Sequence, residues 1–430
     1  MPHPLGPSPV IVDGRRVVVP DIERVDAIIR FDVAEQVATV EASVELTAGE
    51  MAGHPVLDLR QEVEWVRLDG KDLPTTSLPR VDLGGGPDAE MRVLDASLES
   101  GTRHRLDLGY RLGTPAAAGA EPIGWTDGGV RFDLWMSDLE PGRYLEMWLP
   151  APLVHDQFAL DLTVELSRND RPHALVANTG GVDATGGGSR WEICYPAHFT
   201  ALSPMLVLAP ADEVELRRSA ITIPGRERSL GIVCGRFRDA DADIGACEAD
   251  VKAWLAFMAA RYGPWVHGDT FWAFLWGPGR GMEYDGATTA SVGALEHEVF
   301  HSWFGRGVKP ARAADGWIDE AWTTWATSSH ADRPRFASEE LSLDEDPVEL
   351  YPSSPWARYT PREAYDAGYR LFAGLAHLFG GPERLRMAMA DWYRVNAGKL
   401  VTTNGLSAHL TAWSGIDIGP WWARYVHGRG

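Results

Sequence analysis

Two histidines one helical turn apart are the residues in this chain whose types and spacing most directly suggest chemistry. His297 and His301 belong to the sequence His-Glu-Val-Phe-His, and Glu320 follows after eighteen intervening residues. On an α-helix, residues four positions apart lie on the same face, so both imidazoles can direct a nitrogen at one ion. Two imidazoles and one carboxylate, with a water in the fourth position, form a ligand set of catalytic zinc. We therefore predict one Zn²⁺ per chain, held by His297, His301 and Glu320.

Glu298 is the candidate general base. It stands one step round the helix from His297, beside the open coordination position, where a water polarised by zinc needs a carboxylate to take its proton. The alternative is a solvated helix face that carries two histidines. Against it, a separate apolar stripe at helical spacing leaves the histidines on another face; it consists of Val292, Leu295, Val299 and Trp303.

Glu320 lies at the predicted start of a second helix, in Trp-Ile-Asp-Glu-Ala-Trp from Trp317, with acidic residues near the positive helix end. The adjacent Asp319 could orient a ligand, or it could be an exposed carboxylate. The cysteines show no C-x-x-C spacing, so we expect small buried hydrophobic residues and not a closed structural zinc site. They are Cys194, Cys234 and Cys247.

The stretch from His297 to Trp322 resembles the gluzincin aminopeptidases of the aminopeptidase N and leukotriene hydrolase type. HEVFHSWFG followed by WIDEAW is similar to that family's HExxH, its W-F-G continuation and its W-x-x-E-G at the same spacing. Gly281-Met282-Glu283-Tyr284 resembles the family's G-x-M-E-N block, with Tyr284 in place of Asn. The resemblance implies that Glu283 holds the free amino group of a substrate. The alternative for Glu283 is an edge-strand carboxylate that faces water.

A tyrosine further along the chain is the candidate oxyanion donor. Tyr365-Asp366-Ala367-Gly368 resembles the family's Y-x-K-G element, with Ala in place of Lys, which implies that Tyr365 stabilises the oxyanion. Residues 360–363, Thr-Pro-Arg-Glu, form a capping box that predicts a helix beginning there. Tyr369 is one turn further along the same face and competes for the role; a packed core tyrosine is its alternative, and we favour Tyr365.

A second contact to the substrate amine is implied in the first domain. The family places a Gln there just before a Pro-containing turn, and the nearest match is Ser137-Asp138-Leu139-Glu140-Pro141. Asp138 would keep charge complementarity to an ammonium group. Its alternative is a solvated acidic loop residue.

Composition limits the partners. The 430 residues carry a formal net charge of −21 and a pI near 5.0, which argues against binding nucleic acid or anionic membrane. We expect a peptide or small-molecule substrate with a free amine. The first residues lack a signal-peptide pattern, no stretch approaches eighteen apolar residues, and the odd cysteine count gives no disulfide framework, so a cytoplasmic location is expected.

The hydrophobic period changes from two to 3.6 along the chain. Residues 40–46, 106–112 and 158–166 alternate apolar with polar side chains, so residues 1–217 are predicted to be a β-rich sandwich or saddle. After residues 223–226, Ile-Pro-Gly-Arg, helical spacing dominates. The predicted fold class is α+β and multidomain, and the resemblance implies a thermolysin-like, mainly helical catalytic domain at 218–430.

The expected function is that of a zinc-dependent metallopeptidase, an aminopeptidase that removes N-terminal residues. The large helical domain that usually follows in the family is not present, so we expect a more open cleft, or one covered by another subunit in a homo-oligomer. One alternative is a zinc hydrolase of the same family that acts on a non-peptide amide, ester or epoxide. A non-catalytic binding protein is the other, and the intact ligands and base argue against it.

Overall fold

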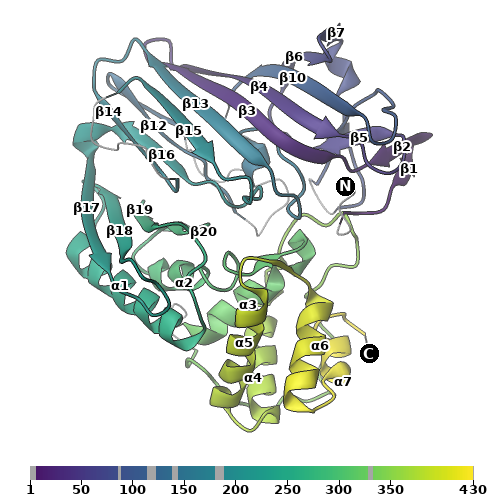
Figure 1. Ribbon diagram of the computed structural model, residues 1–430, viewed down its shortest axis with the longest axis vertical. Helices are drawn as coiled ribbons and strands as arrows, with labels where there is room; N and C mark the ends of the chain where they lie inside the picture. Colours follow the sequence, from purple (N-terminus) through teal and green to yellow (C-terminus); the bar gives the residue numbers. More distant parts are fainter. Residues whose placement is uncertain are drawn as a thin grey trace. The chain divides into compact units, whose positions relative to one another are not determined.

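The computed structural model describes residues 6–85, 89–113, 123–137, 144–179, 188–327 and 333–429 (Figure 1). Contacts between residues divide the chain into two compact units. The first contains Met1–Val214 together with the short segment Ser354–Arg358, and the second contains Glu215–Ser353 and Tyr359–Gly430.

The first unit is built from strands, because its apolar residues alternate with polar ones and can be buried on one side of a sheet. In its largest sheet the described strands follow the order β15-β13-β3-β4-β10-β6-β7. β3 pairs antiparallel with β4 and parallel with β13. The strands are β3 (Asp21–Asp32), β4 (Val37–Thr47), β6 (Val63–Leu68), β7 (Lys71–Leu73), β10 (Arg103–Arg111), β13 (Ala159–Ser167) and β15 (Arg190–Tyr195).

Two further sheets complete the described part of the first unit. One has the order β1-β2-β5-β9-β8 and the other β11-β12-β16-β14. Their strands are β1 (Val10–Val12), β2 (Arg15–Val18), β5 (His54–Leu57), β8 (Arg80–Val81), β9 (Met91–Val93), β11 (Ile123–Thr126), β12 (Gly129–Asp133), β14 (His173–Ala177) and β16 (Leu206–Pro210).

The second unit opens with a sheet of order β17-β18-β19-β21-β20. β18, β19 and β21 run parallel, whereas β20 is an antiparallel strand at the edge. The parallel strands are largely buried, as expected of strands covered by helices. The strands are β17 (Val214–Ile221), β18 (Leu230–Phe237), β19 (Thr270–Leu275), β20 (Gly281–Tyr284) and β21 (Ala287–Ala290).

Helices form the remainder of the second unit, and each contacts its neighbour in sequence from α1 to α6 (Figure 1). Asp243 caps α1, Pro382 begins α5, and Gly415 in a left-handed conformation ends α6. A short parallel pair, β22 (Lys309–Pro310) and β23 (Leu400–Val401), accompanies them. The helices are α1 (Ile244–Arg261), α2 (Leu295–Phe300), α3 (Trp317–Ala326), α4 (Tyr369–Leu378), α5 (Pro382–Asn396), α6 (Thr403–Ser414) and α7 (Gly419–Tyr425).

One hydrophobic core joins these helices to the sheet of the second unit. Its largest members are fully buried tryptophans on or beside the helices that carry the candidate metal ligands: Trp303, Trp317, Trp322 and Trp325. Within the described part of the chain, no helix is both long enough and apolar enough to cross a membrane.

The cysteine prediction is partly wrong. Cys234 and Cys247 are buried, as expected, but Cys194 is exposed. The reason is the alternation of β15, in which Ile193 and Tyr195 point to the buried face and Cys194 to the other.

Candidate metal centre

The two histidines lie on and just after α2. This helix ends at Phe300, but His301 continues in helical conformation, and its backbone N–H donates to the carbonyl of His297 at 3.3 Å. The two imidazole rings pack edge to face, with their centroids 4.7 Å apart. Leu295 and Val299 turn the opposite face of the helix into the core. The turn therefore presents both imidazoles to one point while hydrophobic packing fixes its orientation.

Glu320 enters from the first turn of α3. Its Oε2 atom lies 3.1 Å from Nε2 of His297 and 3.6 Å from Nε2 of His301. Bonds of about 2.0–2.1 Å at a tetrahedral angle place two zinc ligands roughly 3.3 Å apart. The three buried side chains therefore match the atom types and separations of a single zinc site.

The tautomer of His301 is set by a second contact. Its Nδ1 lies 3.0 Å from the carbonyl of Phe304, which can accept a hydrogen bond from it. In the neutral imidazole, this contact favours the proton on Nδ1 and leaves the lone pair of Nε2 for an ion. Among the described residues, Nε2 of His301 has no hydrogen-bond partner. A buried imidazole nitrogen without one is a position that a metal ion would satisfy.

Gly305 lies close to both Asp319 and His301. It adopts φ +121°, and a Cβ atom there would lie 2.7 Å from Oδ2 of Asp319 and 3.1 Å from Nδ1 of His301. Asp319 is buried, so the alternative of an exposed carboxylate is wrong. Its Oδ1 atom accepts a hydrogen bond from the backbone N–H of Glu320 at 3.0 Å, so it contacts the segment that carries this candidate ligand.

The carboxylates and imidazoles of this cluster lie close enough to shift one another's pKa values. Burial raises the pKa of Asp319, and the charges of Glu320 and Glu283 add to this, so the pKa reaches about 8. Burial opposes protonation of His301, yet Glu283 and Glu320 raise its pKa well above the usual value. Burial also opposes ionisation of Glu320, but His301 and His297 hold its pKa well below the usual value. The buried imidazoles and carboxylates therefore lie close enough to stabilise each other's charged forms.

Glu298 lies against the edge strand β20. A Cβ atom on Gly281 would come within 2.5 Å of its Oε1 atom, so only glycine leaves this space. A carboxylate oxygen of Glu298 lies within 4.8 Å of ligand atoms of His301 and Glu283. The carboxylate therefore borders the metal ligands on the side of β20.

Glu283 lies in the middle of β20, where it pairs with Thr288 of β21. It is 3% exposed, so the alternative of a strand carboxylate facing water is wrong. Its Oε1 atom accepts a hydrogen bond from Nη2 of Arg306 at 2.6 Å. Sequence reasoning missed Arg306, which follows the W-F-G segment; its place just after that segment was the available signal.

A second ion pair joins the same two segments. Asp285, in the turn between β20 and β21, is 2.8 Å from Nζ of Lys309 and 3.6 Å from Nδ1 of His267. Nε2 of His267 lies 2.8 Å from the carbonyl of Ser302, beside the metal ligand His301. Burial opposes ionisation of Asp285, but Lys309 and His267 outweigh it, and its pKa falls far below the usual value. Nothing in the sequence pattern pointed to this network.

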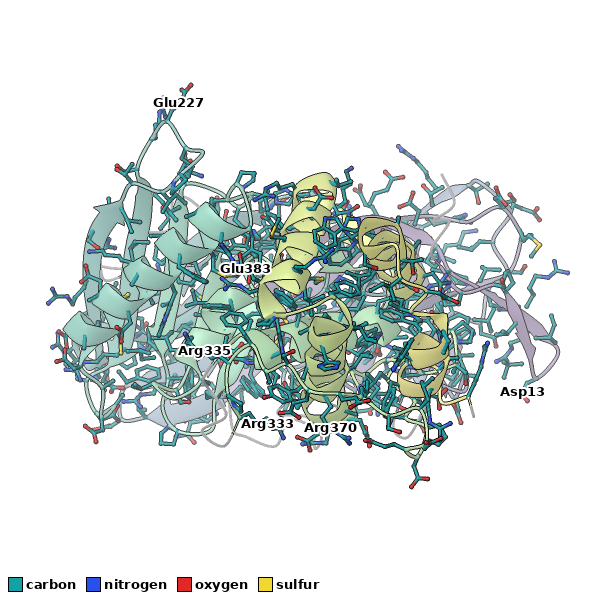
Figure 2. All side chains as sticks on the ribbon, turned by 90° about the horizontal axis from the view of Figure 1, so that it is seen from below. Asp13, Glu227, Arg333, Arg335, Arg370 and Glu383 are labelled. Carbon is teal, nitrogen blue, oxygen red and sulfur yellow. The ribbon has the colours of Figure 1, made fainter. Side chains whose placement is uncertain are left out.

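Tyr365 belongs to a five-residue π-helical turn, Ala364–Gly368, that precedes α4. Its ring lies nearly parallel to that of His297, with an interplanar angle of 21° and centroids 6.0 Å apart. A Cβ atom on Gly368 would come within 2.4 Å of that of Ala321 in α3, so the glycine permits this approach. Arg333, labelled in Figure 2, donates to the carbonyl of Tyr365 at 2.9 Å.

The prediction of a helix beginning with the capping box is confirmed for the backbone and wrong for the cap. Glu363 is already helical and the N–H of Ala364 donates to the carbonyl of Pro361 at 2.9 Å, but the segment receives no side-chain cap and continues as the π-helical turn. The hydroxyl of Thr360 instead lies against Gly316 at the start of α3 and is buried there. The competing Tyr369 is buried and donates its hydroxyl to the carbonyl of Pro334 at 2.9 Å. Asp138 lies outside the described residues.

Comparison with known proteins defines the fold. No protein-family model and no curated protein sequence matches the chain. Among solved structures, the M1 zinc metallopeptidase of Deinococcus radiodurans superposes with a TM-score of 0.64 at 17% identity, covering 96% of this chain and 94% of that one. Aminopeptidase A of Legionella pneumophila superposes with a TM-score of 0.68 at 14% identity, covering 95% of this chain and 49% of that one. Yeast LTA4 hydrolase superposes with a TM-score of 0.62 at 15% identity, covering 96% of this chain and 68% of that one.

The chain therefore has the fold of the M1 zinc metallopeptidases over nearly all of its length. This agrees with the α+β class expected from the change in hydrophobic period. At these identities the likeness shows the fold, and the activity has to be argued from the site itself.

Proposed function

We propose that the chain is a zinc-dependent metallopeptidase of the M1 type and that it acts as an aminopeptidase. The observation that carries the proposal is the convergence of His297, His301 and Glu320 within 4.8 Å, with Glu298 beside them. A zinc ion held by these three residues would supply a Lewis acid that polarises a water and the scissile carbonyl. No nucleic acid enters this chemistry; the partner is a peptide or small-molecule substrate.

Glu298 takes the proton of the attacking water and passes it to the leaving amine. A general base must lie within hydrogen-bond reach of that water. The position of this carboxylate against β20, within 4.8 Å of a ligand atom of His301, supports the role. Its burial limits the positions that the carboxylate can adopt.

Tyr365 donates a hydrogen bond to the oxyanion that develops on the carbonyl. The near-parallel packing of its ring on His297 supports this role. The competing Tyr369 already donates its hydroxyl to the carbonyl of Pro334, which also favours Tyr365. Asp319 orients the adjacent candidate ligand Glu320, whose backbone N–H donates to its Oδ1 atom at 3.0 Å.

Glu283 binds the α-amine of the substrate, and Asp138 remains a predicted second contact. The exopeptidase assignment draws support from two solved structures of this fold. One is a mutant of the Deinococcus enzyme bound to a Tyr-Ser-Ala substrate, and the other is a mutant two-domain M1 zinc metallopeptidase bound to L-tryptophan. A cytoplasmic location and a homo-oligomeric state remain predictions from the sequence.

One observation favours a second candidate function. Because Arg306 already occupies one oxygen of Glu283, the site could serve a zinc hydrolase that acts on a non-peptide amide, ester or epoxide. The fold shared with yeast LTA4 hydrolase is compatible with this alternative.

Elemental analysis of the purified protein, combined with a panel of aminoacyl arylamides, tests the proposal. We expect one zinc per chain and turnover of at least one arylamide. Glu298→Gln should keep its zinc and lose about 10²–10⁴-fold in kcat, the usual contribution of a general base. A zinc-replete wild-type protein that cleaves no arylamide would refute the aminopeptidase assignment, and full activity of Glu298→Gln would refute the role of the base.

A further inference from the structure

Arg306 is a buried cation whose donors are directed at Glu283 and the adjoining backbone. Its side chain is 2% exposed, and Nη2 donates to Oε1 of Glu283 at 2.6 Å. Nε donates to the backbone carbonyl of Glu283 at 3.3 Å, and Nη1 donates to the carbonyl of Gly305 at 3.2 Å. The guanidinium therefore contacts Glu283 through both its side chain and its backbone.

The position of this cation bears on the charge that a substrate meets. An ammonium group bound by Glu283 is attracted by the carboxylate and repelled by the guanidinium 2.6 Å behind it. Charges of opposite sign at such close range cancel much of each other's field in a buried site. The advantage of a charged amine over an uncharged group is correspondingly reduced.

We propose that Arg306 is a specificity-determining residue that partly neutralises Glu283. The site would then accept amides whose acyl group lacks a charged α-amine, in addition to those that carry one. This inference rests on the proposed function, since it assigns Glu283 to the amine end of the substrate. It extends the substrate class from aminoacyl amides to des-amino and N-acylated ones.

Two features keep Glu283 in place when Arg306 is changed. β20 is fixed to β21 by its backbone pairing, including that of Glu283 with Thr288. The neighbouring pair of Lys309 and Asp285 ties the same hairpin to the segment that follows α2. A change of ligand preference in an Arg306 variant would therefore report the lost charge and not a displaced strand.

The test measures binding to zinc-loaded protein in which Glu298→Gln suppresses turnover. The probes are L-phenylalaninamide and 3-phenylpropanamide, which differ only in the α-amine, titrated by calorimetry at pH 6.5, below the α-amino pKa of about 7.7. With Arg306 present, we expect the two dissociation constants to agree within about tenfold. In Arg306→Gln, the preference for phenylalaninamide should rise at least about tenfold.

Two controls accompany the variant. Arg306→Lys keeps the charge and should keep the wild-type preference. Arg335→Gln removes another arginine of this unit, labelled in Figure 2, that pairs with Glu296 of α2. It should also leave the preference unchanged.

Three results would overturn the inference. They are a preference above about a hundredfold while Arg306 is present, an unchanged preference in Arg306→Gln, and failure of both amides to bind. If Arg306→Gln does not fold, Glu283→Gln serves instead, because it leaves the guanidinium unopposed. That variant should bind phenylalaninamide about tenfold more weakly than the protein with Glu283, and it should bind 3-phenylpropanamide with the same affinity. An unchanged affinity for phenylalaninamide would contradict the proposal.

The outcome is separable from that of the proposed function. A wild-type protein that binds both amides but cleaves no arylamide refutes the peptidase and leaves the role of Arg306 standing. A wild-type protein that cleaves aminoacyl arylamides but strongly requires the α-amine for binding supports the peptidase and refutes the role of Arg306.

Discussion

Gly281→Ala should separate catalysis from folding in this site. The new Cβ atom would lie 2.5 Å from Oε1 of Glu298, whereas ordinary contacts of this kind begin near 3.4 Å. The carboxylate must therefore move by about 0.9 Å. Because it is the end of a flexible side chain, the move costs little stability, but misplacing a catalytic group by about 1 Å can lower the rate by about 10²-fold.

The expected result is a fall of about 10²-fold in kcat, with zinc content and melting temperature close to wild type. The measurements are arylamide turnover under zinc-replete conditions, elemental analysis and thermal denaturation. Gly293→Ala is the matched control, since Gly293 precedes α2, has no positive φ, and has nothing within 4 Å of the added Cβ atom. The reasoning fails if Gly281→Ala keeps kcat within twofold of the control, or if it loses zinc.

Three other changes probe the remaining parts of the site. Glu320→Ala should not retain zinc, so the rise in melting temperature that zinc gives the wild type should disappear; an equal rise in the variant would contradict the ligand assignment. Tyr365→Phe should lower kcat by about 10²–10³-fold at full zinc occupancy. Tyr369→Phe should instead cost about 1 kcal/mol of unfolding free energy with turnover unchanged, and reversed effects in this pair would favour Tyr369 as the donor. Lys309→Met should cost about 3–5 kcal/mol in urea denaturation, since it leaves the Asp285 carboxylate buried beside His267 alone. The native pKa of Asp285 lies below its unfolded value, so its contribution is complete above about pH 4 and is lost as the pH falls further; the variant should lose this acid dependence, and an unchanged pH profile would count against the pairing.

The convergence of the candidate metal ligands His297 and His301 could be predicted because its geometry is local. The two residues are fixed relative to each other by one helical turn, and the apolar residues Leu295 and Val299 determine which face of that turn is buried. The ends of two helices are local in the same sense, because Pro382 at the start of α5 and Gly415 after α6 have backbone chemistry of their own. In these cases the deciding contacts are close in sequence.

Features that depend on contacts between distant segments could not be predicted. The capping box before Tyr365 looks complete as a local pattern, but the hydroxyl of Thr360 packs against Gly316 at the start of α3 and does not cap the helix, whose backbone begins at Glu363 and continues as a π-helical turn. Arg306 and Lys309 form ion pairs with Glu283 and Asp285, which lie far from them in sequence. No spacing rule connects a strand hairpin with the segment that follows a helix. The exposure of Cys194 likewise follows from which face of β15 is covered.

Three glycines explain how charged groups from separate elements come together in so small a volume. Gly281 admits the carboxylate of Glu298, Gly305 leaves space beside Asp319 and His301, and Gly368 lets the turn that bears Tyr365 approach α3. In each case the smallest residue lies on one segment and the functional group, or the helix that carries it, meets it from another. Burial makes unpaired charge costly, and at Glu283 the ion pair with Arg306 removes that cost. At the candidate metal centre the carboxylate of Glu320 lies against the imidazoles of His297 and His301, and a zinc ion bound there would balance its charge.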